Sequence, residues 1–141
     1  MNTPVELQHA LSRPSMFVPA VEFDVLAAFI LGFDAASNGG AVVGLREWLV
    51  VQVGGCDNLA WTELVLRLAF PDAESPRQKL LDQANQQQAV ERLVALLNAF
   101  WEKRGSHTGL EQIYFEYHQW LKTQSWYKPG FPGWMGETTI R

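Results

Sequence analysis

The most reactive side chains of the sequence belong to one cysteine, Cys56, and to three histidines, His9, His107 and His118. A cysteine can act as a nucleophile when a neighbouring imidazole removes the proton of its thiol. Cys56 lies in a glycine-rich segment, and His107 or His118 is a formal partner for it. A lone cysteine in a small domain more commonly fills space in the core. A small enzyme that uses Cys56 and a histidine is therefore an alternative hypothesis, and not the favoured one.

Metal and nucleotide chemistry find little support in the sequence. The histidines lack neighbouring ligands at the spacing of zinc sites, and one cysteine cannot build a thiolate site. The chain also lacks the glycine-rich phosphate-binding motifs and the GxSxG motif of serine hydrolases. We therefore expect no metal, no cofactor and no catalytic residue.

Three carboxylates lie in segments that read as turns. Asp57 belongs to Gly54–Asn58, and Asp72 and Glu74 belong to Pro71–Ser75. Exposed turns on a rigid scaffold are common places for binding groups. We therefore take Asp57, Asp72 and Glu74 as candidate partner-binding residues.

Two tryptophans near the carboxyl end, Trp126 and Trp134, are further candidates for partner binding. They lie in a segment rich in proline and glycine, which predicts irregular structure. We favour docking of these aromatic side chains onto the rest of the protein, because large exposed apolar patches are rare on monomers. A homo-oligomeric structural protein, such as a homodimer held together by this tail, is the other alternative.

Composition narrows the class of partner. The 141 residues carry a formal net charge of −4, and the 11 basic residues are scattered. Nucleic acids and anionic membranes are therefore disfavoured, because both require clustered Lys and Arg. The chain has no apolar run of about 20 residues and its start does not resemble a signal peptide. We expect a cytoplasmic protein.

Apolar periodicity predicts an all-α fold, with five or six helices in an irregular bundle. Residues 1–141 form one domain in this interpretation, with a helical core over 1–123 and a tail over 124–141. Trp48, Trp61, Trp101 and Trp120 are expected in the core. The polar run 83–88 either continues a short helix or interrupts it. The expected helical segments cover residues 3–12, 20–38, 41–53, 60–70, 75–81, 89–105 and 108–123, and 75–81 and 89–105 form one helix if the polar run continues it.

Local signals fix several helix ends. A capping box over Thr3–Glu6 is expected at the first helix, and Ser75 is expected to cap the helix that begins at Pro76. The segment 41–53 is predicted as a helix in preference to a buried strand, because a lone strand has no neighbour to pair with.

The run Arg13-Pro14-Ser15-Met16-Phe17 is the most distinctive segment of the chain. Pro14 is predicted to end the first helix, because a proline pushes the preceding residue out of the helical region. Met16 and Phe17 are predicted to fill the core between the first two helices, and Arg13 to contact the last carbonyls of the first.

Arg-Pro-x-Met-Phe is followed by a helix with Leu31-Gly32-Phe33, by Glu47-Trp48-Leu49 and by a helix that begins at Trp61. This order resembles small bacterial immunity-type proteins of polymorphic toxin systems. The resemblance implies a protein that neutralises a cognate toxin by direct one-to-one binding in the cytoplasm, without a cofactor. In such a protein Arg13, Pro14, Met16, Phe17 and Gly32 mark the fold and not a reaction.

Overall fold

The computed structural model describes residues 3–128 and is helical, with no strand among these residues. The all-α prediction is thereby confirmed, and so is the helical choice for the segment around Trp48. Six α-helices and two short 3-10 helices follow one another within the described residues. They are α1 (Val5–Ser12), η1 (Pro14–Met16), α2 (Phe23–Ala36), α3 (Leu45–Val53), α4 (Trp61–Ala69), η2 (Pro76–Leu81), α5 (Gln83–Gly105) and α6 (Gly109–Lys122).

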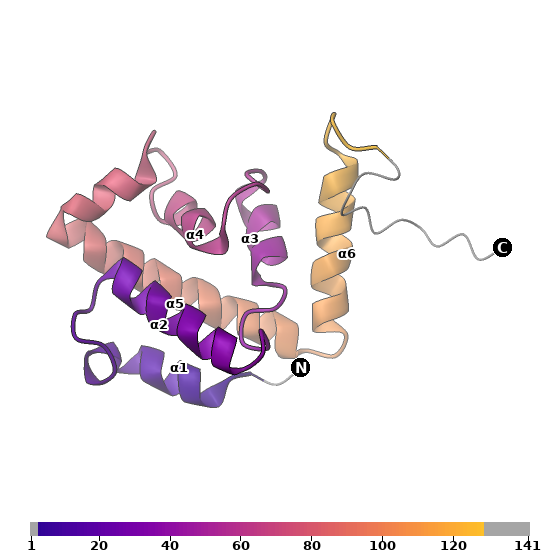
Figure 1. The fold of residues 1–141 in the computed structure, drawn as a ribbon. Coiled ribbons are helices and arrows are strands. Elements are labelled where there is room, and N and C mark those ends of the chain that lie inside the picture. Colours follow the sequence, from indigo (N-terminus) through magenta and orange to yellow (C-terminus); the bar gives the residue numbers. More distant parts are fainter. Residues whose placement is uncertain (1–2, 129–141) are drawn as a thin grey trace.

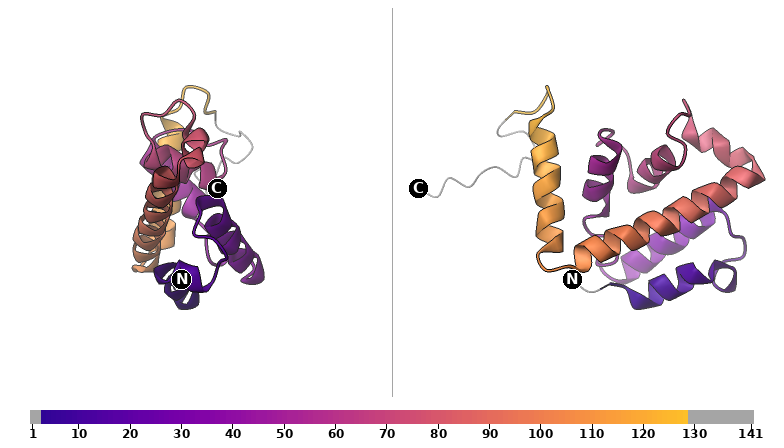
Figure 2. Two further views of the ribbon diagram at one scale, coloured as in Figure 1. Left: turned by 90° about the vertical axis from the view of Figure 1, so that its left-hand side faces the viewer. Right: turned by 180° about the vertical axis from the view of Figure 1, so that it is seen from behind.

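The long helix α5 organises the others. In Figure 1, α1 and α2 lie along one side of α5, α3 and α4 lie along the other, and α6 stands across its carboxyl end. Figure 2 shows the same arrangement from the side and from behind. Three of the four expected core tryptophans, Trp48, Trp61 and Trp101, are at most 9% exposed, while Trp120 is partly buried at the edge of the core.

The polar run 83–88 forms the first turns of α5. Asp82 caps this helix by accepting a hydrogen bond from the backbone N–H of Ala84 at 2.9 Å. Gln86 accepts a bond from the backbone N–H of Phe23 and donates one to the carbonyl of Leu80. Gln88 donates to the carbonyl at the end of α4. The glutamines thus satisfy backbone groups at the ends of three neighbouring helices, groups that would otherwise lack partners.

The capping predictions are wrong in detail. Helix α1 begins at Val5 with Pro4 in the capping position, and no side chain caps it. Because Pro4 takes the position next to the helix, Thr3 lies one residue too early to serve as the cap. Ser75 does occupy the capping position of η2, as predicted, but its side chain makes no capping hydrogen bond.

The core-filling role predicted for Met16 and Phe17 is also wrong. Pro14 does follow the end of α1, but it opens the 3-10 turn η1, which swings Met16 and Phe17 outward. Met16 is 71% exposed and Phe17 is 44% exposed, whereas Val18 is only 8% exposed and enters the core. The backbone N–H of Val18 is held by the carbonyl of Pro14 at 3.0 Å.

The other two residues of the predicted structural motif also lie at the surface. Arg13 follows the last residue of α1, and its backbone N–H, not its guanidinium, donates to a carbonyl of that helix, at Ala10. Gly32 lies exposed inside α2, and a side-chain carbon placed on it would have no neighbour within 4 Å.

The loop between α2 and α3 is held from beneath by α5. Trp101 donates its indole N–H to the carbonyl of Ala41 at 2.9 Å, and Arg104 donates to the carbonyl of Val43 at 3.2 Å. Asp34 accepts the backbone N–H of Val42 at 3.0 Å. Arg104 is only 1% exposed, and its Nε and Nη2 atoms have no hydrogen-bond partner among residues 3–128.

The turn from α5 into α6 is tight. Thr108 has a φ of 59°, a left-handed conformation that is strained for a β-branched residue. At Gly109 a Cβ atom would lie 2.1 Å from the carbonyl oxygen of Lys103, so only glycine fits. Further along α6, Glu116 accepts a salt bridge from Lys103 of α5 at 3.0 Å.

Over residues 3–128, none of the helices combines the length and the apolar character that crossing a membrane would require.

Candidate functional site

The turn between α4 and η2 carries two of the predicted partner-binding residues, Asp72 and Glu74, and both are exposed. The turn begins at the buried Phe70, whose carbonyl accepts the backbone N–H of Ala73 at 3.1 Å. It ends at the buried Pro76, which opens η2. Both ends of the turn are therefore fixed to the core, and the carboxylates stand on a defined scaffold.

Arg77 lies in η2, directly after the turn, and links η2 to two helices. Its guanidinium donates to Asp24 of α2 at 3.0 Å and to Glu63 of α4 through Nε at 2.9 Å. The hydrogen bond to Glu63 and then that to Asp24 raise the pKa of Arg77, while its partial burial opposes this rise. Exposed ion pairs contribute little free energy singly. Here one guanidinium joins three elements, so its main effect is to fix the orientation of η2.

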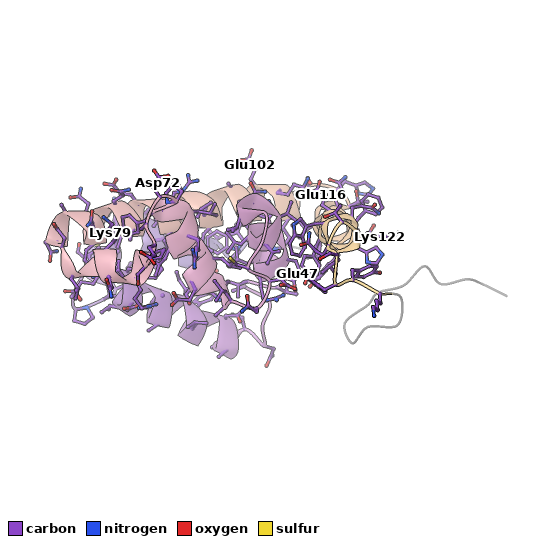
Figure 3. The ribbon with its side chains drawn as sticks, turned by 90° about the horizontal axis from the view of Figure 1, so that it is seen from above. Glu47, Asp72, Lys79, Glu102, Glu116 and Lys122 are labelled. Atoms are coloured by element: carbon purple, nitrogen blue, oxygen red, sulfur yellow. The ribbon has the colours of Figure 1, made fainter. Side chains whose placement is uncertain are left out.

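The turn borders an open hollow of about 740 Å³. A smaller hollow of about 260 Å³ adjoins it and shares Asp72, Ala73 and Lys79. Figure 3 shows Asp72 and Lys79 at the same end of the molecule, away from Glu116 and Lys122 of α6. The larger hollow is lined by Asp72, Ala73, Glu74, Ser75, Gln78 and Lys79.

The lining is polar, and its charges are two carboxylates and one ammonium group. Lys79 and Gln78 are not among the residues predicted from the sequence. A spacing of three residues places Gln78 beside Ser75 and Lys79 beside Pro76 only when the segment forms a 3-10 helix, which the sequence does not predict. The two carboxylates can accept hydrogen bonds from a basic partner and form ion pairs with it. The ammonium group of Lys79 can form an ion pair with an acidic group of the same partner.

Asp57 lies in a different turn, between α3 and α4. This turn begins with Gly54 and continues through Cys56, both in the left-handed region, with φ of 76° and 61°. Asp57 is partly buried and does not line the hollow beside Asp72. Figure 1 shows that this turn and the α4–η2 turn project from the same side of the molecule, opposite α1. The two turns therefore share one side of the protein without forming a single pocket.

Of the two tryptophans predicted in the tail, Trp126 is 41% exposed. Its side chain is therefore partly covered by the rest of the protein and partly accessible to solvent. It follows α6, whose carboxyl end projects to the same side as the two turns in Figure 1. Trp134 lies outside the described residues.

The alternative pair of Cys56 and a histidine gains no geometric support. Cys56 is partly buried and packs against the hydrophobic core. His107 is exposed, and His118 lies edge-on to the ring of Tyr127, 6.2 Å between ring centroids. Within residues 3–128, no hydrogen bond joins Cys56 to either histidine. The same part of the chain contains no cluster of three potential metal ligands.

Comparison of the chain with protein-family models, with curated proteins and with solved structures finds no match.

Proposed function

We propose that this chain is a non-catalytic bacterial binding protein, an immunity protein that neutralises a cognate toxin by covering the toxin's active site in the cytoplasm. The observation that carries the proposal is the fixed acidic turn between α4 and η2. Asp72 and Glu74 are exposed there on a scaffold anchored by Phe70 and Pro76. The order of motifs that resembles immunity proteins supports the same role.

The chemistry of the turn suggests the kind of toxin. Carboxylates can occupy positions that phosphate groups would take in the basic cleft of a nuclease, because both present negatively charged oxygen acceptors. The turn that contains Asp57 projects to the same side of the molecule (Figure 1), and its carboxylate would extend the negative surface. Charge complementarity of this kind speeds association and selects the partner. The proposed partner is therefore a nuclease toxin with a basic active-site cleft.

The test uses the protein encoded by the gene next to that of this chain, and calorimetry measures the binding of the two proteins. Replacing Asp57, Asp72 and Glu74 together with alanine should weaken binding at least thirtyfold, since a few interface residues commonly carry most of the binding free energy. The affinity of the unsubstituted chain should fall as salt is added, and the affinity of the variant should respond less.

A matched control removes the same number of charges elsewhere. Glu91, Glu102 and Glu111 are exposed, lie on α5 and α6 and do not line the hollow. Their triple alanine variant should bind within about threefold of the unsubstituted chain. If both triple variants weakened binding equally, the loss of affinity would come from the change in net charge and not from the acidic turns. If the variant of Asp57, Asp72 and Glu74 bound as tightly as the unsubstituted chain, the acidic-turn interface would be refuted. If the protein encoded by the neighbouring gene neither binds this chain nor is neutralised by it, the proposed immunity function is wrong.

A further inference from the structure

A second surface, on the opposite side of the molecule, consists of the outward side of α1 and the turn that follows it (Figure 1). The inner side of α1 is buried through Leu7, Ala10 and Leu11. Its outer side, together with η1, leaves large apolar side chains in contact with solvent. We name this surface the α1 face and define it by Val5, Glu6, His9, Arg13, Met16 and Phe17.

The apolar part of the α1 face is large for so short a segment. Val5 is 66% exposed, Met16 is 71% exposed and Phe17 is 44% exposed. The ring of Phe17 lies between those of His9 and Phe29, each 6.3 Å away between centroids. The aromatic contacts hold Phe17 in place at the surface and connect it to the exposed side of α1. Large exposed apolar side chains therefore stand at both ends of α1, and such exposed apolar surface marks sites of association.

The charged part of the α1 face is complementary to itself. Glu6 lies in the first turn of α1 and Arg13 directly follows its last residue. The two charges therefore stand at opposite ends of α1, the acid at its amino end and the base just beyond its carboxyl end. Both are exposed, and neither forms an ion pair within residues 3–128.

We propose that the α1 face binds a second copy of this chain in an antiparallel α1–α1 contact around a two-fold axis. The axis crosses α1 at right angles, midway between Glu6 and Arg13. Each Glu6 then faces Arg13 of the other copy, and each Val5 faces the Pro14–Phe17 end of the other α1. A two-fold axis requires such a self-complementary patch, because one surface meets its own copy.

The division of roles between apolar and charged groups follows from their energetics. The apolar side chains supply the favourable free energy of association, whereas exposed ion pairs are worth little and mainly fix the register. The face is small, so we expect a dissociation constant in the micromolar range, as for other small interfaces. The chain as a whole carries a charge of −4. The α1 face contributes one acid and one base, so two copies meet there without strong repulsion.

The test is sedimentation equilibrium over a range of concentrations up to about 200 µM, where a dimer has twice the 15.9 kDa mass of one chain. Glu6→Arg and Arg13→Glu should each raise the dissociation constant at least tenfold, since every substitution creates two like-charge contacts across the axis. The double variant, Glu6→Arg with Arg13→Glu, should restore it to within about threefold. Only a contact between copies of the same face can give this rescue.

An independent variant tests the apolar contact. Val5→Asp puts a carboxylate into the first turn of α1, where it suits the helix dipole and should leave the fold intact. It should nevertheless abolish the dimer, because Val5 faces apolar side chains of the second copy. Control substitutions on other helices, Glu102→Arg and Arg67→Glu, should leave the dissociation constant unchanged.

A chain that remains monomeric at every concentration would overturn the proposal. So would a dimer that tolerates Val5→Asp, or single charge reversals that the double variant does not rescue. If the chain is monomeric and Val5→Asp instead abolishes binding to the neighbour-encoded protein, the α1 face belongs to that partner. These outcomes are separate from those of the acidic-turn variants, which lie on the other side of the molecule.

Discussion

Arg104 is the one charged side chain that the core buries among residues 3–128, and it lacks a carboxylate within salt-bridge distance there. Burial lowers the pKa of Arg104, and the charge of Asp34 acts in the opposite direction. Its contacts are one hydrogen bond to the carbonyl of Val43 and the face of the Phe100 ring, 5.0 Å away. Two of its nitrogens, Nε and Nη2, are therefore desolvated without a hydrogen-bond partner among residues 3–128, which costs free energy.

We expect Arg104→Met to leave the free energy of unfolding unchanged or to raise it by up to about 2 kcal/mol, because an apolar side chain of similar length removes the buried charge. Urea denaturation measures this. Trp101→Phe is the contrasting variant, since it orphans the carbonyl of Ala41 and should cost about 1–3 kcal/mol. A loss above about 2 kcal/mol in Arg104→Met would instead mean that the guanidinium is stabilising.

Tyr114 makes the free energy of unfolding depend on pH in the alkaline range. Burial, and then the charge of Glu47, raise the pKa of Tyr114 above its ordinary value of 10.0. The unfolded chain therefore loses the phenol proton at a lower pH than the folded chain does. The contribution of Tyr114 to stability is complete below pH 10 and is lost as the pH rises through the folded-state pKa.

We expect Tyr114→Phe to remove this contribution. Urea midpoints recorded from pH 8 to about 11 should fall less steeply in the variant than in the unsubstituted chain. Below pH 9 the two slopes should coincide, which is the internal control. Parallel curves over the whole range would show that Tyr114 ionises equally in both states.

At the scale of the elements, the α5–α6 turn depends on a glycine that the bundle cannot replace. A Cβ atom at Gly109 would meet two backbone carbonyl oxygens, of Lys103 at 2.1 Å and of Arg104 at 2.7 Å. Backbone atoms cannot move aside as a flexible side chain can. We therefore expect Gly109→Ala to displace α6 and to cost more than about 3 kcal/mol, measured by thermal or urea unfolding.

Gly32→Ala is the matched control with the opposite sign. Gly32 lies inside α2 with open space around it. Alanine there should stabilise the protein by about 0.5–1 kcal/mol through its higher helix propensity. If both substitutions changed stability by the same amount and sign, the tight turn at Gly109 would have no special importance.

The elements also show which parts of the fold the sequence predicts. Regular apolar spacing located the helices around Trp48 and Trp61, because one buried face repeats with the period of the helix. The start of α5 was missed because Gln86 and Gln88 carry no apolar signal and find their partners at Phe23 and Ala69, distant in the sequence.

The outward position of Met16 was missed for a related reason. Its residue type favours burial, and only the direction of the turn at Pro14 decides that Val18 enters the core instead. In the candidate site, Asp72 and Glu74 were found because turn-forming residues surround them. Lys79 was missed because its place beside them depends on the 3-10 geometry of η2.

At the scale of the whole molecule, the two proposed interfaces lie on opposite sides. The acidic turns project away from α1, which lies beyond α5 in Figure 1. A dimer formed through the α1 face would therefore leave both acidic turns free, and each copy could hold one toxin. The proposals predict a complex of two chains of each kind, and neither interface has to open for the other to form.

The contacts of α5 also have a consequence for the order in which the chain folds as it is made. The first residue of α2, Phe23, finds the hydrogen-bond partner of its N–H 63 positions later, in Gln86. Gln8 of α1 reaches Asn98, 90 positions later. At about 5–20 residues per second, a ribosome needs roughly 3–13 seconds to cover the first of these gaps. During that time the apolar side of α2 has no α5 to cover it, so the nascent chain exposes that side until α5 has been made.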